Sequence, residues 1–114
     1  MRIRPIGVLA VVLAGCEGRG ALISVANQSG RELNNIVVSG RGFVDTIARL
    51  APGQMNQILV RPRGESGVAL SFSAADRRVV VPEQGYLADC CGFSVRLTIN
   101  PALKAEFDLR LDRR

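Results

Sequence analysis

The sequence contains no histidine, the residue that proteins use most often as a general base and as a metal ligand. Without histidine, neither a Ser-His-Asp nor a Cys-His catalytic site can be assembled. The single lysine, Lys104, stands near the end of the chain with no suggestive pattern beside it. We therefore predict a protein that is not an enzyme and that uses neither a metal nor a cofactor.

Aromatic residues are also scarce, with no tryptophan, one tyrosine and four phenylalanines. Basic residues outnumber acidic ones by 15 to 10, but arginines are adjacent only at Arg77-Arg78 and Arg113-Arg114. Nucleic-acid binding requires a clustered basic surface, with aromatic side chains on which bases can stack. The composition therefore argues against a nucleic-acid partner and predicts a mildly basic, solvated surface.

No hydrophobic run is long enough to span a bilayer, because the apolar residues from Ile6 to Leu13 fall well short of ~20. The run follows Arg2 and Arg4 and precedes small residues, which is the order found in a secretory signal peptide. The residues Leu13-Ala14-Gly15-Cys16 resemble the lipobox of bacterial lipoproteins at all four positions. The alternatives are an ordinary signal peptide, or a buried apolar strand that ends in cysteine.

The resemblance to bacterial lipoproteins implies cleavage before Cys16, with Leu13, Ala14 and Gly15 recognised by the lipoprotein signal peptidase. The Cys16 thiol then carries a diacylglyceryl group, and its freed amine carries a further fatty acid such as palmitate. Several acyl chains on one residue hold a protein on a membrane, whereas one chain gives only marginal binding. Glu17 stands where aspartate favours retention in the inner membrane, so the resemblance indicates the outer membrane, facing the periplasm.

The rest of the chain predicts β-strands, because apolar and polar residues alternate with a period of two. Val68, Leu70 and Phe72 alternate with small residues, and the segments 93–99 and 105–111 repeat the pattern. Each of these strands is therefore expected to have one buried face and one solvent-exposed face. The segments 43–50 and 55–60 have ambiguous faces, which indicates edge strands or bulges. The expected strands are 21–27, 33–39, 43–49, 55–61, 67–74, 77–81, 93–100 and 104–111.

Turn residues separate these strands, as at Pro52-Gly53, which suits a type II turn. Seven or eight short strands without helical periodicity predict an all-β fold, a small Ig-like antiparallel β-sandwich. The expected organisation is a signal peptide at 1–15, a lipidated cysteine and short tether at 16–20, and the sandwich at 21–114.

Three short motifs make the chain similar to small Ig-like or transthyretin-like envelope lipoproteins of bacteria. They are the turn Asn27–Gly30 after the first strand, Leu50–Gly53 before a mid-chain strand, and Gly85-Tyr86 before the final hairpin. This resemblance implies a sandwich architecture and carries over no catalytic residue.

Cys90 and Cys91 are neighbours, so their Cα atoms lie about 3.8 Å apart, which is closer than in most disulfides. We favour burial of one or both as small apolar residues. A vicinal disulfide in a turn at Gly92, and an intermolecular or metal contact, are the alternatives. The chain has no C-x-x-C motif, which a redox enzyme would be expected to show.

Two charged segments are weaker candidates for a site. Glu83 and Asp89 flank Gly85-Tyr86 in an expected loop, as a pair of catalytic carboxylates could, although solvated loop acids are the favoured interpretation. The segment Arg61–Gly67 could bind an anion such as a phosphate or a lipid head group, although a charged hairpin tip is the favoured interpretation.

These features together predict a membrane-anchored envelope lipoprotein that presents a β-sandwich in the periplasm and does not act as an enzyme. Its expected partners are the membrane, through Cys16, and an envelope protein, bound by loops or by an edge strand. The alternative is a small inhibitor or immunity lipoprotein that acts on a periplasmic enzyme.

Overall fold

The computed structural model describes residues 20–87 and 93–111, and these form eight β-strands and no helix. The all-β prediction is confirmed, and all strand boundaries except the end of the 77–81 segment agree to within one residue. The strands are β2 (Ala21–Asn27), β3 (Leu33–Gly40), β4 (Phe43–Leu50), β5 (Met55–Val60), β6 (Ser66–Ala74), β7 (Arg77–Leu87), β8 (Phe93–Ile99) and β9 (Ala105–Leu111).

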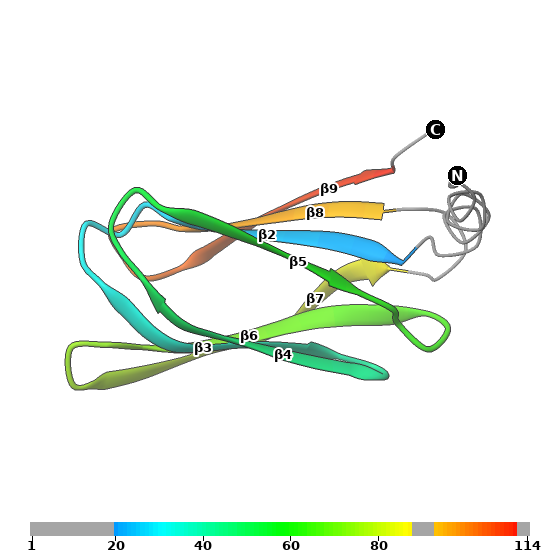
Figure 1. Ribbon diagram of the computed structural model, residues 1–114, viewed down its shortest axis with the longest axis horizontal. Helices are drawn as coiled ribbons and strands as arrows, with labels where there is room; N and C mark the ends of the chain where they lie inside the picture. Colours follow the sequence, from blue (N-terminus) through cyan, green and yellow to red (C-terminus); the bar gives the residue numbers. More distant parts are fainter. Residues whose placement is uncertain (1–19, 88–92, 112–114) are drawn as a thin grey trace, which may run out of the picture.

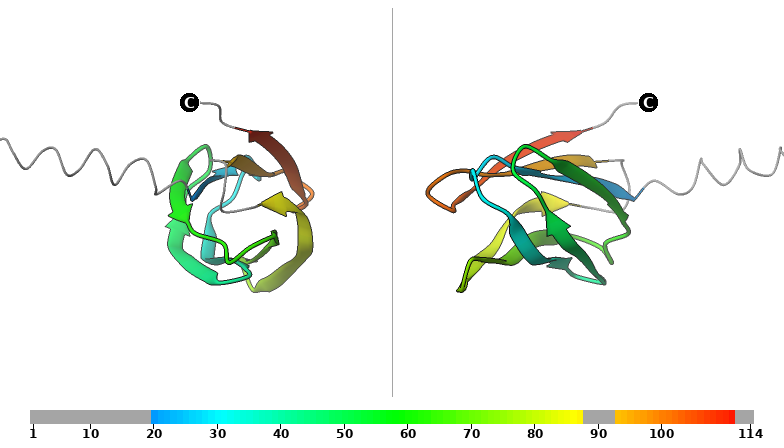
Figure 2. Two further views of the ribbon diagram at one scale, coloured as in Figure 1. Left: turned by 90° about the vertical axis from the view of Figure 1, so that its right-hand side faces the viewer. Right: turned by 60° about the vertical axis from the view of Figure 1, so that its left-hand side comes forward.

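The strands form two four-stranded sheets, ordered β5-β2-β8-β9 and β4-β3-β6-β7, which face each other as a sandwich (Figure 1). Figure 2 shows the two layers from other sides. The first two strands lie in different sheets, whereas in an immunoglobulin constant domain they share one. The sandwich is therefore confirmed, and its strand order differs from that of an immunoglobulin constant domain.

One strand pair departs from the predicted antiparallel arrangement. Five of the six pairs are antiparallel, but β2 and β8 run parallel, with Ile23 opposite Val95. A parallel pair needs a long crossover connection between its strands. Here the connection between β2 and β8 includes β5 and all four strands of the opposite sheet. After this crossover, β8 begins at the same end of the sandwich as β2.

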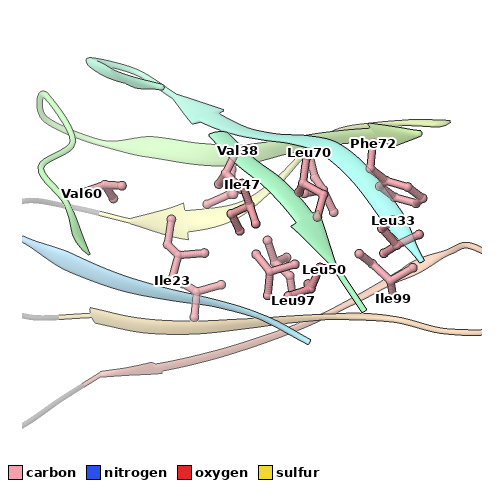
Figure 3. Close-up of a cluster of buried hydrophobic side chains, with 14 of the residues drawn as sticks. Ile23, Leu33, Val38, Ile47, Leu50, Val60, Leu70, Phe72, Leu97 and Ile99 are labelled. Carbon is pink, nitrogen blue, oxygen red and sulfur yellow. The ribbon is translucent and has the colours of Figure 1, made fainter. Parts of the chain in front are cut away.

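Apolar side chains from both sheets fill the space between the layers (Figure 3). Phe72, Ile23 and Leu33 are completely buried. Every second residue of Ser66–Ala74 is buried, as the alternation predicts, and the same holds for Val95, Leu97 and Ile99 in β8. The predicted inward faces of these two strands are therefore confirmed.

The strands with ambiguous faces, β4 and β5, are edge strands, as the sequence suggested. An edge strand has one neighbour instead of two, so its side chains are covered less completely. Val44 of β4 is 70 % exposed and Leu59 of β5 is 60 % exposed, although both are apolar. On the edge strand β9, Phe107 and Leu109 are only half-buried.

Strand β7 extends to Leu87, so the prediction that it ends at residue 81 and gives way to a loop is wrong. Pro82 has no N–H donor, but β7 is an edge strand, where a missing donor is tolerated. The register between β6 and β7 shifts at two places, which accommodates the extra residues. Gly85 has a φ of 78°, and a Cβ there would overlap the ring of Phe107, so glycine allows β7 to approach β9 closely.

The connections gather at two opposite ends of the sandwich (Figure 1). The Gly20 end holds Gly20, the β3–β4 turn at 41–42 and the β5–β6 loop at 61–65. The Asn27 end holds the connections 28–32, 51–54, 75–76 and 100–104. The predicted Pro52-Gly53 turn lies at the Asn27 end and is confirmed, because Gly53 has a φ of 83° and the Gln54 N–H donates to the Ala51 carbonyl over 3.0 Å.

Asn27 ties the connections of its end together from a completely buried position. Its side-chain nitrogen donates to the backbone carbonyl oxygens of Arg31, over 2.8 Å, and Leu50, over 2.9 Å. Its Oδ1 accepts from the backbone N–H of Ser29, over 3.0 Å, and from the Ser29 hydroxyl, over 2.6 Å. One side chain at the end of β2 thus holds the following turn and the end of β4 in the opposite sheet.

Candidate functional site

Several of the residues singled out from the sequence lie outside the described part of the chain. These are the lipobox Leu13–Cys16, the pair Cys90 and Cys91, and Asp89. The inferences drawn on them remain predictions. The described strands on either side of Asp89, Cys90 and Cys91 lie in different sheets: β7 ends at Leu87 in one, and β8 begins at Phe93 in the other.

Glu83 and Lys104 are described, and neither is part of a cluster. Glu83 is an exposed residue of β7, and its side chain packs over β6. A Cβ added at Gly67 of β6 would lie only 2.6 Å from the Cγ of Glu83. It therefore lies in a strand and not in the predicted loop. Lys104 is exposed in the β8–β9 connection, and its backbone N–H donates to Oδ1 of Asn100 over 3.0 Å. Within residues 20–87 and 93–111, no three acidic or cysteine side chains come together as metal ligands would.

The segment Arg61–Gly67 is joined by a residue that the sequence did not connect with it. The backbone N–H of Arg63 donates to the Arg41 carbonyl over 2.9 Å, and the Arg41 N–H donates to the Ser66 hydroxyl over 2.8 Å. A Cβ at Gly42 would lie 2.7 Å from the Cβ of Arg63, so the β3–β4 turn rests against the β5–β6 loop. This contact brings together three exposed arginines, here called the arginine cluster: Arg41, Arg61 and Arg63.

The start of the described chain lies beside the arginine cluster. A Cβ at Gly20 would lie 2.7 Å from the Val60 carbonyl oxygen, 3.4 Å from Cδ1 of Leu59 and 3.5 Å from Cγ of Arg61. Gly20 has a φ of 49°, which suits glycine at this close approach. The chain therefore enters the sandwich next to an exposed leucine and the arginine cluster, at the end that faces the viewer in the left view of Figure 2.

A shallow groove crosses the outer face of the β5-β2-β8-β9 sheet, with a volume of about 290 Å³. Its lining comes from all four strands: Leu22 and Ser24 of β2, Gln57 of β5, Ser94, Val95 and Arg96 of β8, and Asp108 and Arg110 of β9. Ser24 lies opposite Gln57 on one side and Arg96 on the other, and Arg96 lies opposite Asp108. The polar residues that line the groove are Ser24, Gln57, Ser94, Arg96, Asp108 and Arg110.

The groove offers hydrogen-bond donors and acceptors to a polar partner. Gln57 donates to the Ser24 hydroxyl over 3.2 Å, and Arg110 lies 3.7 Å from Asp108. Two guanidinium groups and one carboxylate give these lining residues a net positive charge. The alternation in 93–99 and 105–111 already placed Arg96, Asp108 and Arg110 on a wet face. It could not show that this face continues onto β2 and β5, because that depends on strand order.

No helix in the described residues is long and apolar enough to cross a membrane. No known protein family and no curated protein matches the chain. Among solved structures, the chain is similar to the NMR structure of a protein from Eubacterium rectale, with a TM-score of 0.61 at 13 % sequence identity. The similarity covers 84 % of this chain and 91 % of the other, so the sandwich as a whole is a fold that another protein shares.

Proposed function

We propose that this chain is a lipid-anchored binding module of the bacterial cell envelope, and not an enzyme. The observation that carries the proposal is the lipobox Leu13-Ala14-Gly15-Cys16, which is followed after a few residues by the first strand at Ala21. The order of anchor, tether and folded domain along the chain is that of a protein held at a membrane surface. Glu17 in place of aspartate favours the outer membrane, with the domain facing the periplasm.

The surface that supports a binding role is the groove on the outer face of the β5-β2-β8-β9 sheet. Edge strands and grooves of sheets recognise other proteins through backbone hydrogen bonds and side-chain pockets. The two arginines and one aspartate of the groove fit a partner segment with an excess of acidic residues, because opposite charges steer encounter and fix the register. The proposed partner is therefore a protein of the envelope that presents such a segment.

The anchor is tested by labelling cells that express the full chain with a fatty-acid analogue. The wild-type chain is expected to carry the label, and Cys16→Ser is expected to lose it and to leave the membrane fraction. Cys90→Ser and Cys91→Ser are the matched controls, since each removes one thiol elsewhere and should retain the label. Label that persists in Cys16→Ser contradicts the anchor.

The binding role is tested by co-purification of the wild-type chain from detergent-solubilised membranes. Recovery of an envelope component that is lost with Arg96→Glu, but kept with Arg77→Glu, supports the groove as the binding surface. Arg77 is the control because it is an exposed arginine at the Asn27 end, away from the groove. Recovery of a soluble hydrolase, inhibited by the chain, would instead support the inhibitor alternative.

A further inference from the structure

We infer that the arginine cluster binds the phosphate groups of anionic phospholipids, so that the sandwich stands on the membrane with its Gly20 end. The inference rests on the proposed anchor at Cys16 and adds the orientation of the domain and the class of lipid that it contacts. Three observations carry it: the length of the tether, the placement of the arginines, and the exposed apolar side chain next to the entry point of the chain.

The tether sets the distance between the membrane and the Gly20 end. Four residues separate Cys16 from Gly20 along the chain, counting Gly20 itself, and a fully extended chain covers about 3.5 Å per residue. Gly20 can therefore lie at most ~14 Å from the lipidated residue. Electrostatic attraction at physiological ionic strength decays over ~8 Å, so charges beside Gly20 lie within about two decay lengths of the lipid phosphates.

The arginines that meet this surface are already placed by the fold. The bonds from Arg63 to Arg41 and from Arg41 to Ser66 hold the turn and the loop together, so the backbone positions of Arg41 and Arg63 are set by the fold. Guanidinium groups bind phosphate through paired N–H donors. The two ion pairs found within the described residues, Arg49–Glu32 and Arg110–Asp108, do not involve the cluster. Glu65 is the one acid in the 61–65 loop.

Leu59 adds an apolar contact at the same place. Leu59 is 60 % exposed. It lies beside the start of the described chain, because a Cβ added at Gly20 would be 3.4 Å from the Cδ1 of Leu59. An exposed apolar side chain beside basic ones is a composition that favours the interface of an anionic bilayer. The exposed leucine is thus accounted for by the membrane surface next to the tether.

The expected gain is a few-fold for each arginine. An arginine near an anionic membrane surface contributes ~1 kcal/mol, which corresponds to about five-fold in an equilibrium constant. Removal of all three arginines should therefore lower the ratio of membrane-docked to undocked orientations by roughly 100-fold.

The test measures hydrogen–deuterium exchange of the full chain, purified from bacterial cells, on vesicles of phosphatidylcholine with and without phosphatidylglycerol. On the anionic vesicles we expect slower exchange at residues 41–43 and 59–65, with no change at 51–54, 75–76 and 100–104. The variant with Arg41→Gln, Arg61→Gln and Arg63→Gln should lose this protection. The variant with Arg31→Gln, Arg77→Gln and Lys104→Gln is the matched control, since it removes the same charge from exposed positions at the Asn27 end and should keep the protection.

The outcomes separate this inference from the proposed anchor. Flotation with neutral vesicles reports the anchor alone, because acyl chains insert regardless of lipid charge. A wild-type chain that floats with neutral vesicles but shows no added protection on anionic ones keeps its anchor and overturns the inference. A chain that floats only with anionic vesicles, through the arginine cluster, overturns the anchor and supports lipid binding by the cluster. Equal loss of protection in both triple variants also overturns the inference, because it would reflect net charge and not position.

Discussion

Replacement of Asn27 tests whether a buried polar side chain holds the two sheets together at one end. In Asn27→Ala, the Leu50 carbonyl and the Ser29 N–H lose the partners that the side chain provides at 2.9 and 3.0 Å. The Ser29 hydroxyl and the Arg31 carbonyl retain each other, at 3.1 Å. Two backbone groups are therefore left without these partners in a buried environment.

The cost follows from the burial of these groups. A buried donor or acceptor that loses its partner costs about 1–3 kcal/mol, so the two together should lower the free energy of unfolding by roughly 2–6 kcal/mol. Single domains unfold with about 5–15 kcal/mol, so this loss is a large part of the stability of a small sandwich. Asn27→Asp has nearly the same volume and keeps the acceptor, but it replaces the donor with a carboxylate that faces two carbonyl oxygens. We expect it to destabilise the chain at neutral pH at least as much as alanine does.

Urea denaturation followed by far-ultraviolet circular dichroism measures these changes, and the slope of the free energy against urea should stay constant. Asn56→Ala is the control, because Asn56 is an exposed asparagine on β5, and surface changes usually fall within about 0.5 kcal/mol. If Asn27→Asp is as stable as the wild-type chain, the hydrogen bonds do not hold the two sheets together and the reasoning is refuted.

The other predictions concern the core, a glycine and the paired cysteines. Phe72→Ala should cost about 3–5 kcal/mol in urea denaturation, because the side chain is completely buried, and a loss below about 1 kcal/mol would contradict its place in the core. Gly85→Ala should destabilise far more than Gly53→Ala: both glycines have positive φ, but a Cβ at Gly85 would overlap an aromatic ring of β9, whereas a Cβ at Gly53 meets nothing within 4 Å. Alkylation and intact-mass measurement without reductant should find a free thiol at Cys90 or Cys91, and a mass lower by two hydrogens with no alkylation would show a vicinal disulfide instead.

The sequence predicted what depends on neighbouring residues. Alternation of apolar and polar residues is local, so the strands and the inward faces of β6 and β8 could be read from it. Turn chemistry is local as well, and the Pro52-Gly53 turn is where it was expected. The prediction was wrong at Pro82, because whether proline ends a strand depends on whether the strand is at an edge, and this is a property of the sheet.

For the candidate sites, the sequence by itself gives the resemblance of Leu13–Cys16 to a lipobox and the charges of the 61–67 segment, because both are runs of consecutive residues. Only the tertiary structure decided that Arg41 joins Arg61 and Arg63, that Asn27 is buried, and that β2 pairs in parallel with β8 to carry a groove. These contacts join residues far apart in the chain, and their partners are chosen by the packing of two whole sheets. No local pattern contains that information, because many strand orders bury the same alternating faces.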